Sequence, residues 1–124
     1  MKLIQVAQQA KNLLRAIDFY EKLLGAAPTA TFDPPGLAFF DLDGVRLLLD
    51  TGAPSALIYL AVPDVREATR RLEGEGAEIV TAPHIIFSHT DGVLGPAGTD
   101  EWMAFILDSE GNTVALVSQL PPGS

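Results

Sequence analysis

The sequence predicts an α+β chain of two tandem units, each with the order strand, helix, strand, strand, strand. Segments of alternating apolar residues and segments with apolar residues three or four apart occur in the same order in both halves. A shift of 52 positions places Asn12 on Asp64. A shift of 67 positions places Gly44 on Gly111, because the second half carries a longer loop. An internal repeat of this kind indicates a fold more strongly than local propensity does.

The first unit is expected over residues 1–50. Its opening strand, LIQVAQQA, precedes a helix that Asn12 caps and that Gly25 ends in a left-handed conformation. Three further strands follow, separated by the turns PPG and DG. The expected ranges are 3–10 for the first strand, 13–24 for the helix, and 27–33, 37–42 and 45–50 for the meander.

The second unit is expected over residues 56–119, after a linker at 51–55 (TGAPS) and before a tail at 120–124. Asp64 offers an N-cap for the helix VREATRRLEGEG. A loop rich in Gly, Pro and Asp precedes the last hairpin, whose turn is DSEGN. The expected strands lie at 57–62, 77–86, 101–107 and 113–118.

The composition excludes several classes of function. The 124 residues carry 8 basic and 16 acidic side chains, a formal net charge of −8. A field of that sign repels nucleic acid and anionic membranes, so neither is expected as a partner. The absence of cysteine excludes disulfides and thiol nucleophiles, and no apolar run has the ~18 residues needed to cross a bilayer. We expect a cytoplasmic protein with a single compact domain.

Three motifs point to a family. RAIDFYEKLLG in the first unit, VPDVREA at the start of the second helix and FILDSEGNTVAL near the end resemble the vicinal oxygen chelate superfamily. That superfamily includes glyoxalase, bleomycin resistance proteins and extradiol dioxygenases, and the resemblance covers essentially the whole chain. It implies a sheet curled into an incomplete barrel around a cavity, usually completed by dimerisation. A homodimer is therefore expected.

The resemblance also implies where a metal would bind. Metal-dependent members take a His or Gln from the first strand of each unit and a Glu from the last strand of each unit. The matching positions here are Gln5, Leu48, Leu57 and Ala115. A divalent ion needs several oxygen or nitrogen donors, and one glutamine cannot hold it. We therefore expect no metal cofactor at the inherited site.

Both histidines lie in the stretch APHIIFSHTD. His89 and Asp91 are two residues apart and so point to the same side of an extended chain, and Asp100 and Glu101 lie across the loop. These four residues leave open a metal site at a new position. His84 has two open interpretations. It ends a strand and bonds a backbone carbonyl, or it serves as an acid–base or ligand-anchoring group, since an imidazole titrates near neutrality.

Strand parity indicates which side chains face away from the helices. Alternate residues of a strand point to opposite faces, and the non-helical face here mixes Gln, Tyr, Arg and small apolar groups. Apolar walls with a few polar groups are typical of a ligand pocket, although a dimer contact has a similar composition. The expected ligand-binding residues are Gln5, Arg46, Tyr59, His84 and Trp102, with stacking from Phe39 or Phe40.

Two functions follow. The first is a metal-free protein of the glyoxalase/bleomycin resistance type that binds a small organic ligand, with sequestration as its role. The alternative is a glyoxalase- or epimerase-like lyase or isomerase, in which His84 abstracts a proton next to a carbonyl. Gln5, Arg46 or Tyr59 would then hold the developing oxyanion.

Overall fold

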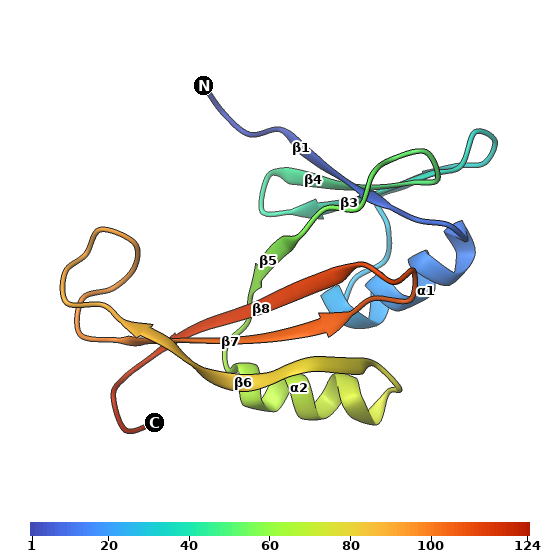
Figure 1. Ribbon diagram of the computed structural model, residues 1–124. Helices are drawn as coiled ribbons and strands as arrows, with labels where there is room; N and C mark the ends of the chain where they lie inside the picture. Colours follow the sequence, from blue (N-terminus) through green and yellow to red (C-terminus); the bar gives the residue numbers. More distant parts are fainter. The chain divides into compact units, whose positions relative to one another are not determined.

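The computed structural model describes residues 1–124 and divides into two compact units (Figure 1). The first contains residues 1–56 and 108–112, and the second contains residues 57–107 and 113–124. Each unit has one helix and one four-stranded sheet. No helix has the length and apolar character needed to cross a membrane.

The first sheet has the strand order β1-β4-β3-β2, with β1 parallel to β4 and the other pairs antiparallel. Its helix, α1, begins and ends as predicted. The Asn12 side chain accepts a hydrogen bond from the backbone N–H of Arg15 (3.1 Å), and Gly25 adopts a φ of 72°. The elements of the unit are β1 Gln5–Gln9, α1 Leu13–Leu24, β2 Ala30–Phe32, β3 Leu37–Leu42 and β4 Val45–Asp50.

The second sheet repeats this arrangement with the order β5-β8-β7-β6, and α2 runs alongside β6 (Figure 1). β5 is parallel to β8, and the remaining pairs are antiparallel. Neither sheet closes on itself, because each keeps two edge strands. The predicted fold of two βαβββ units is confirmed. The elements are β5 Ile58–Ala61, α2 Val65–Gly74, β6 Glu78–Ser88, β7 Asp100–Leu107 and β8 Thr113–Leu120.

Several element boundaries differ from the prediction by one to three residues, among them those of β2, β6 and α2. β2 has only three residues, because Pro34 and Pro35 have no backbone N–H with which to continue the ladder beyond Phe32. β6 extends through His84 to Ser88 rather than ending at 86. α2 ends at Gly74, two residues earlier than expected.

In each unit the helix covers one face of its own sheet, and that face forms the core. Alternate strand residues there are almost fully buried, as period-two alternation requires. On this face Leu47, Leu49, Val114 and Leu116 are no more than 1% exposed. The opposite face of each sheet has no helix of its own unit.

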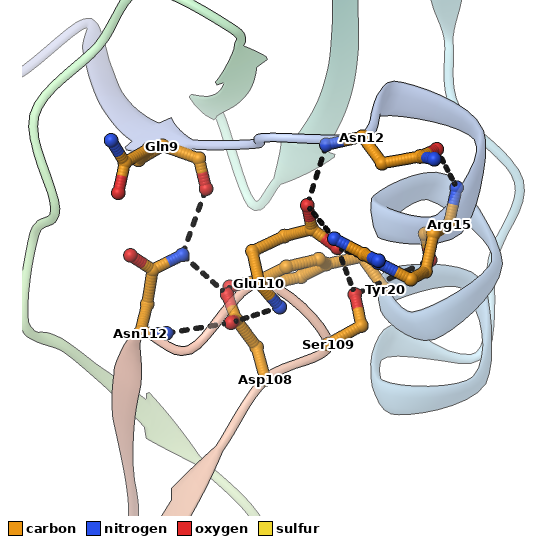
Figure 2. A network of polar contacts seen from close by, with 8 residues as sticks. All are labelled: Gln9, Asn12, Arg15, Tyr20, Asp108, Ser109, Glu110 and Asn112. Atoms are coloured by element: carbon orange, nitrogen blue, oxygen red, sulfur yellow. Dashed lines mark hydrogen bonds and ion pairs between the residues drawn. The ribbon is translucent and has the colours of Figure 1, made fainter.

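A buried polar network closes the first unit around the turn at 108–112 (Figure 2). The Tyr20 hydroxyl donates to Asp108 Oδ2 (2.7 Å), and Asp108 Oδ1 accepts from the backbone N–H groups of Glu110 and Asn112 (both 2.8 Å). The Asn112 side chain donates to Asp108 and to the Gln9 carbonyl. Burial and the charge of Asp108 raise the pKa of Tyr20, so its phenol remains a donor.

Glu110 completes this network from the same turn. Its carboxylate accepts hydrogen bonds from the backbone N–H of Asn12 (2.7 Å), from Arg15 Nε (2.7 Å) and from the Ser109 hydroxyl (2.8 Å). Burial alone would raise the pKa of Glu110. The Arg15 guanidinium and the other two donors outweigh burial and lower the pKa to about 2.

The lowered pKa of Glu110 makes the stability of the chain depend on pH. A carboxylate with a depressed folded-state pKa stabilises fully above its unfolded value, near 4.5, and this contribution is lost as the pH falls toward 2. We expect Glu110→Gln to lower the free energy of unfolding at neutral pH by roughly 1 to 2 kcal/mol, allowing for the exposed guanidinium of Arg15. The variant should also flatten the pH dependence between about pH 5 and 2.

Urea denaturation at several pH values measures both effects. Glu67→Gln is the control, because Glu67 pairs with Arg70 on an exposed helix surface. It should leave the pH profile unchanged. If the free energy of unfolding of Glu110→Gln falls between about pH 5 and 2 as steeply as that of the unmodified chain, Glu110 is not the source of this pH dependence.

Candidate functional site

The uncovered face of the first sheet consists of an apolar row beside a polar row. Strand register places Ala7, Leu48, Phe39 and Ala30 side by side across four strands. The neighbouring row is Gln5, Arg46 and Asp41. A flat apolar surface with hydrogen-bonding groups along one end can hold an organic molecule and fix its orientation.

Arg46 and Gln5, both predicted ligand-binding residues, lie together in that polar row. Arg46 Nε donates to the Gln5 side-chain carbonyl (2.9 Å), and its guanidinium lies 6.0 Å from the ring centre of Phe39. Phe39 in turn meets the Phe32 ring edge-on at 6.0 Å. Phe40, the other expected stacking residue, is 1% exposed and belongs to the core.

The positions that correspond to metal ligands in the superfamily do not fit a metal. The Gln5 oxygen already accepts a hydrogen bond from a cationic guanidinium, which repels a second cation. Leu48, Leu57 and Ala115 offer only carbon. No group of three or more His, Asp or Glu side chains lies close enough together to hold an ion.

The uncovered face of the second sheet also carries a row with aromatic side chains. One row consists of Tyr59, Ala115, Phe105 and Thr81. The Tyr59 and Phe105 rings lie 6.4 Å apart on the strands either side of Ala115, which is fully buried. A glutamate at position 115 would have to displace this ring pair. The alanine at the position expected to match the superfamily's glutamate therefore lies within an aromatic row.

His84 lies in the adjacent row, beside Met103, and is exposed. Its Nδ1 lies 3.0 Å from the carbonyl oxygen of Ala82, as one of the two interpretations of this residue expected. The strand does not end there. His84 and Tyr59 share a face but lie on the two edge strands, so roughly three strand spacings, about 14 Å, separate their backbones.

Trp102 does not join these residues. It pairs with Ile85 and Ser118 on the face that α2 covers, and the Arg66 guanidinium of α2 lies 4.8 Å from its ring centre. The alternation along β7 places Met103 and Phe105 on the uncovered face instead. The expectation that Trp102 and Tyr59 share a ligand-binding face is corrected accordingly. These two β7 residues are ones that sequence reasoning missed.

His89 is buried and forms part of a different cluster. Its Nε2 lies 2.9 Å from Glu101 Oε1, which also accepts a hydrogen bond from the Gln119 side chain (3.0 Å). Asp91 and Asp100, the other two residues of the hypothetical metal site, do not bond to His89 or Glu101. Asp91 accepts from the Val93 backbone and Asp100 from the Ser88 hydroxyl.

Gln8 is a buried polar residue that the sequence analysis passed over. It lies at 0% exposure, and its side-chain amide bonds both the N–H and the carbonyl of Ala56 (2.8 Å each). The available signal was parity, because Gln8 lies between Val6 and Ala10 on the side of the strand that faces the helix. A polar residue at such a position needs a partner, and the backbone of Ala56, directly after the linker, supplies it.

The His89 cluster leaves no room for a side chain at Gly95. A Cβ there would lie 2.8 Å from His89 Cε1 and 3.2 Å from Gln119 Nε2. We expect Gly95→Ala to destabilise the chain by roughly 1 to 3 kcal/mol, because the loop or the histidine must move. Urea denaturation measures the change. Gly92→Ala is the matched control, since nothing lies within 4 Å of a Cβ there, and equal stability of the two variants would contradict the packing.

Comparison with known proteins agrees with this fold. The sequence profile of the Glyoxalase/Bleomycin resistance protein/Dioxygenase superfamily matches residues 2–116. Lactoylglutathione lyase from Agrobacterium tumefaciens is 22% identical with a TM-score of 0.67, over 94% of this chain and 92% of that one. An integron cassette protein from the mobile metagenome of V. cholerae is 18% identical with a TM-score of 0.68, over 94% of each chain. No curated protein matches the sequence.

A further solved structure, a glyoxalase/bleomycin resistance protein/dioxygenase from Alicyclobacillus acidocaldarius, is 16% identical with a TM-score of 0.65, over 94% of this chain and 89% of that one. Identities this low show a common fold and transfer no activity. The profile match, by contrast, extends over most of the sequence. The chain belongs to the glyoxalase/bleomycin resistance protein/dioxygenase superfamily.

Proposed function

We propose that this chain binds a small organic molecule on the uncovered faces of its sheets without a metal ion, and that sequestration is its role. The observation that carries the proposal is the composition of those faces. Each has an apolar row, containing Phe39 in one sheet and Phe105 in the other, next to a few polar side chains. Small-molecule sites have this composition.

The arrangement favours binding over metal-assisted chemistry. Glyoxalase-type isomerisation needs a charge that stabilises an enolate, and the positions that would hold a metal carry aliphatic carbon or a glutamine bonded to Arg46. Capture of a ligand needs none of this. Apolar contact area and a few oriented hydrogen bonds are sufficient for it.

We also propose that the chain forms a homodimer in the cytoplasm. Exposed apolar side chains such as Tyr59 (55%) and Phe32 (52%) support self-association, because aromatic groups are enriched at subunit contacts. The absence of cysteine from the chain is compatible with the cytoplasmic location.

Neutral aromatic probes test the binding proposal. We expect indole and benzamide to shift the NMR signals of uncovered-face residues such as Phe39 and Phe105 in a saturable way, with dissociation constants on the order of 1 mM, as is usual for fragments. Tyr59→Ala should weaken the response of the second sheet several-fold. The control is Leu14→Ala, a substitution on the outer surface of α1, where the side chain is 74% exposed.

Shifts that grow without saturation, or that spread evenly over the helices and the sheets, would contradict the proposal. Comparable weakening by Leu14→Ala would contradict it as well, because that side chain lies outside both uncovered faces.

A second candidate, a glyoxalase- or epimerase-like lyase or isomerase, is favoured by the geometry of His84. When neutral, an imidazole whose Nδ1–H donates to the Ala82 carbonyl has an unprotonated Nε2, and the side chain is exposed on the same face as Met103. Such a nitrogen can act as a general base toward a C–H beside a carbonyl.

Deuterium uptake distinguishes the two candidates. With dihydroxyacetone in D₂O, an enzymatic His84 should accelerate uptake at carbon, and His84→Gln should abolish the acceleration. Under sequestration alone, the unmodified chain gives no acceleration, and His84→Gln still binds the neutral probes.

A further inference from the structure

We propose that Arg46 is an anion anchor, and that the ligand is a small organic acid whose carboxylate or phosphonate binds the guanidinium while its apolar body lies along Phe39. This inference rests on the proposed binding function and narrows it to a chemical class. All residues involved belong to the first unit.

Arg46 differs from every other arginine of the chain in having no carboxylate partner. The other four each lie within 3.5 Å of an acidic oxygen: Arg15 with Glu110, Arg66 with Asp64, Arg70 with Glu67 and Arg71 with Glu75. No ion pair within 4.0 Å involves Arg46. In a chain with twice as many acidic as basic side chains, an unpaired guanidinium is conspicuous.

The nearest candidate partner is otherwise engaged. Asp41 lies directly opposite Arg46 in the β3–β4 register. Its Oδ1 accepts the backbone N–H of Gly44 (3.2 Å), which ties it into the hairpin turn. Asp43 and Gly44 of that turn have φ values of 51° and 90°, as a type I′ hairpin requires. The turn therefore holds the carboxylate that could otherwise neutralise the guanidinium.

Gln5 orients the guanidinium and leaves its terminal nitrogens for a ligand. Because the Gln5 oxygen accepts from Nε, the two Nη groups keep their outward N–H donors. Those donors form the planar fork that matches the two oxygens of a carboxylate or phosphonate. Gln5 is thus a positioning residue, and Arg46 makes the contact.

The apolar row supplies the second half of the recognition. Leu48 is one pleat along β4 from Arg46, on the same face, and pairs with Phe39. Leu48 is only 7% exposed, whereas Phe39 is half-buried, so a ligand held by its anionic group at Arg46 would place an attached ring or chain against Phe39. Charge at one end and carbon at the other define an organic acid rather than an inorganic anion.

Matched acid and amide probes test the proposal. Benzoate and phenylphosphonate carry the anion, and benzamide is the neutral counterpart of the same size. We expect benzoate to bind about fivefold more tightly than benzamide, the scale of an exposed ion pair, and to shift the Arg46 Nε–H NMR signal. The preference should shrink as salt is raised. Phenylphosphonate distinguishes a phosphonate ligand from a carboxylate ligand.

Three variants separate contact from positioning. Arg46→Gln should bring benzoate down to the affinity of benzamide without weakening benzamide. Gln5→Glu keeps the shape but pairs the guanidinium with a carboxylate, so it should remove the acid preference too, whereas Gln5→Asn should keep part of it. Arg70→Gln, on the exposed surface of α2, is the matched control and should change nothing.

The outcomes distinguish the two levels of the proposal. Equal binding of benzoate and benzamide to the unmodified chain overturns the anion anchor and leaves the binding function standing. Acid preference that survives Arg46→Gln also overturns it. Failure of all three probes to bind overturns the binding function together with the anchor.

Discussion

A single constraint organises both halves of this molecule: each sheet has a helix of its own unit on one face only. Strand residues alternate between faces, so every second side chain enters the core and the remainder face away from the helix. Most of the core positions are filled by apolar side chains, such as Phe40, Leu47 and Ile106, at close to zero exposure. The remaining strand residues do not pack against the helix, and among them apolar and polar side chains are mixed. The candidate site is inferred from this mixed face rather than from any catalytic motif.

Side-chain contacts bear on the expected loss of a metal site as well as residue identity does. Gln5, expected to match one metal ligand of the superfamily, accepts a hydrogen bond from Arg46, and Ala115, expected to match another, pairs with both Tyr59 and Phe105 in the strand register. A single glutamate at position 115 would meet this aromatic pair, whose ring centres lie 6.4 Å apart. A fold can keep its backbone while the chemistry on one face is replaced by contact surface.

The fold could be predicted because its signals are local in the sequence. The candidate site could be predicted only in part, because it depends on contacts between residues far apart in the sequence. Asn12, Gly25 and Asp64 delimit helices through hydrogen bonds a few residues away, which a sequence displays directly. Gln5 and Arg46 were placed correctly on one face by parity. Trp102 was not, because its selection rested on aromatic character rather than alternation. The partners of Gln8 and Tyr20 lie 48 and 88 positions along the chain, where no periodicity indicates them.

The turn at 108–112 bears on how the chain is made. It belongs to the first compact unit, although 51 residues of the second unit, 57–107, precede it. Asn12 and Arg15 bond Glu110 across 98 and 95 positions. During synthesis, the amino-terminal repeat thus emerges from the ribosome lacking the segment that satisfies its buried tyrosine and its first helical turn. The first unit can therefore complete its folding only after residue 112 has been translated, so the two repeats do not fold independently of each other.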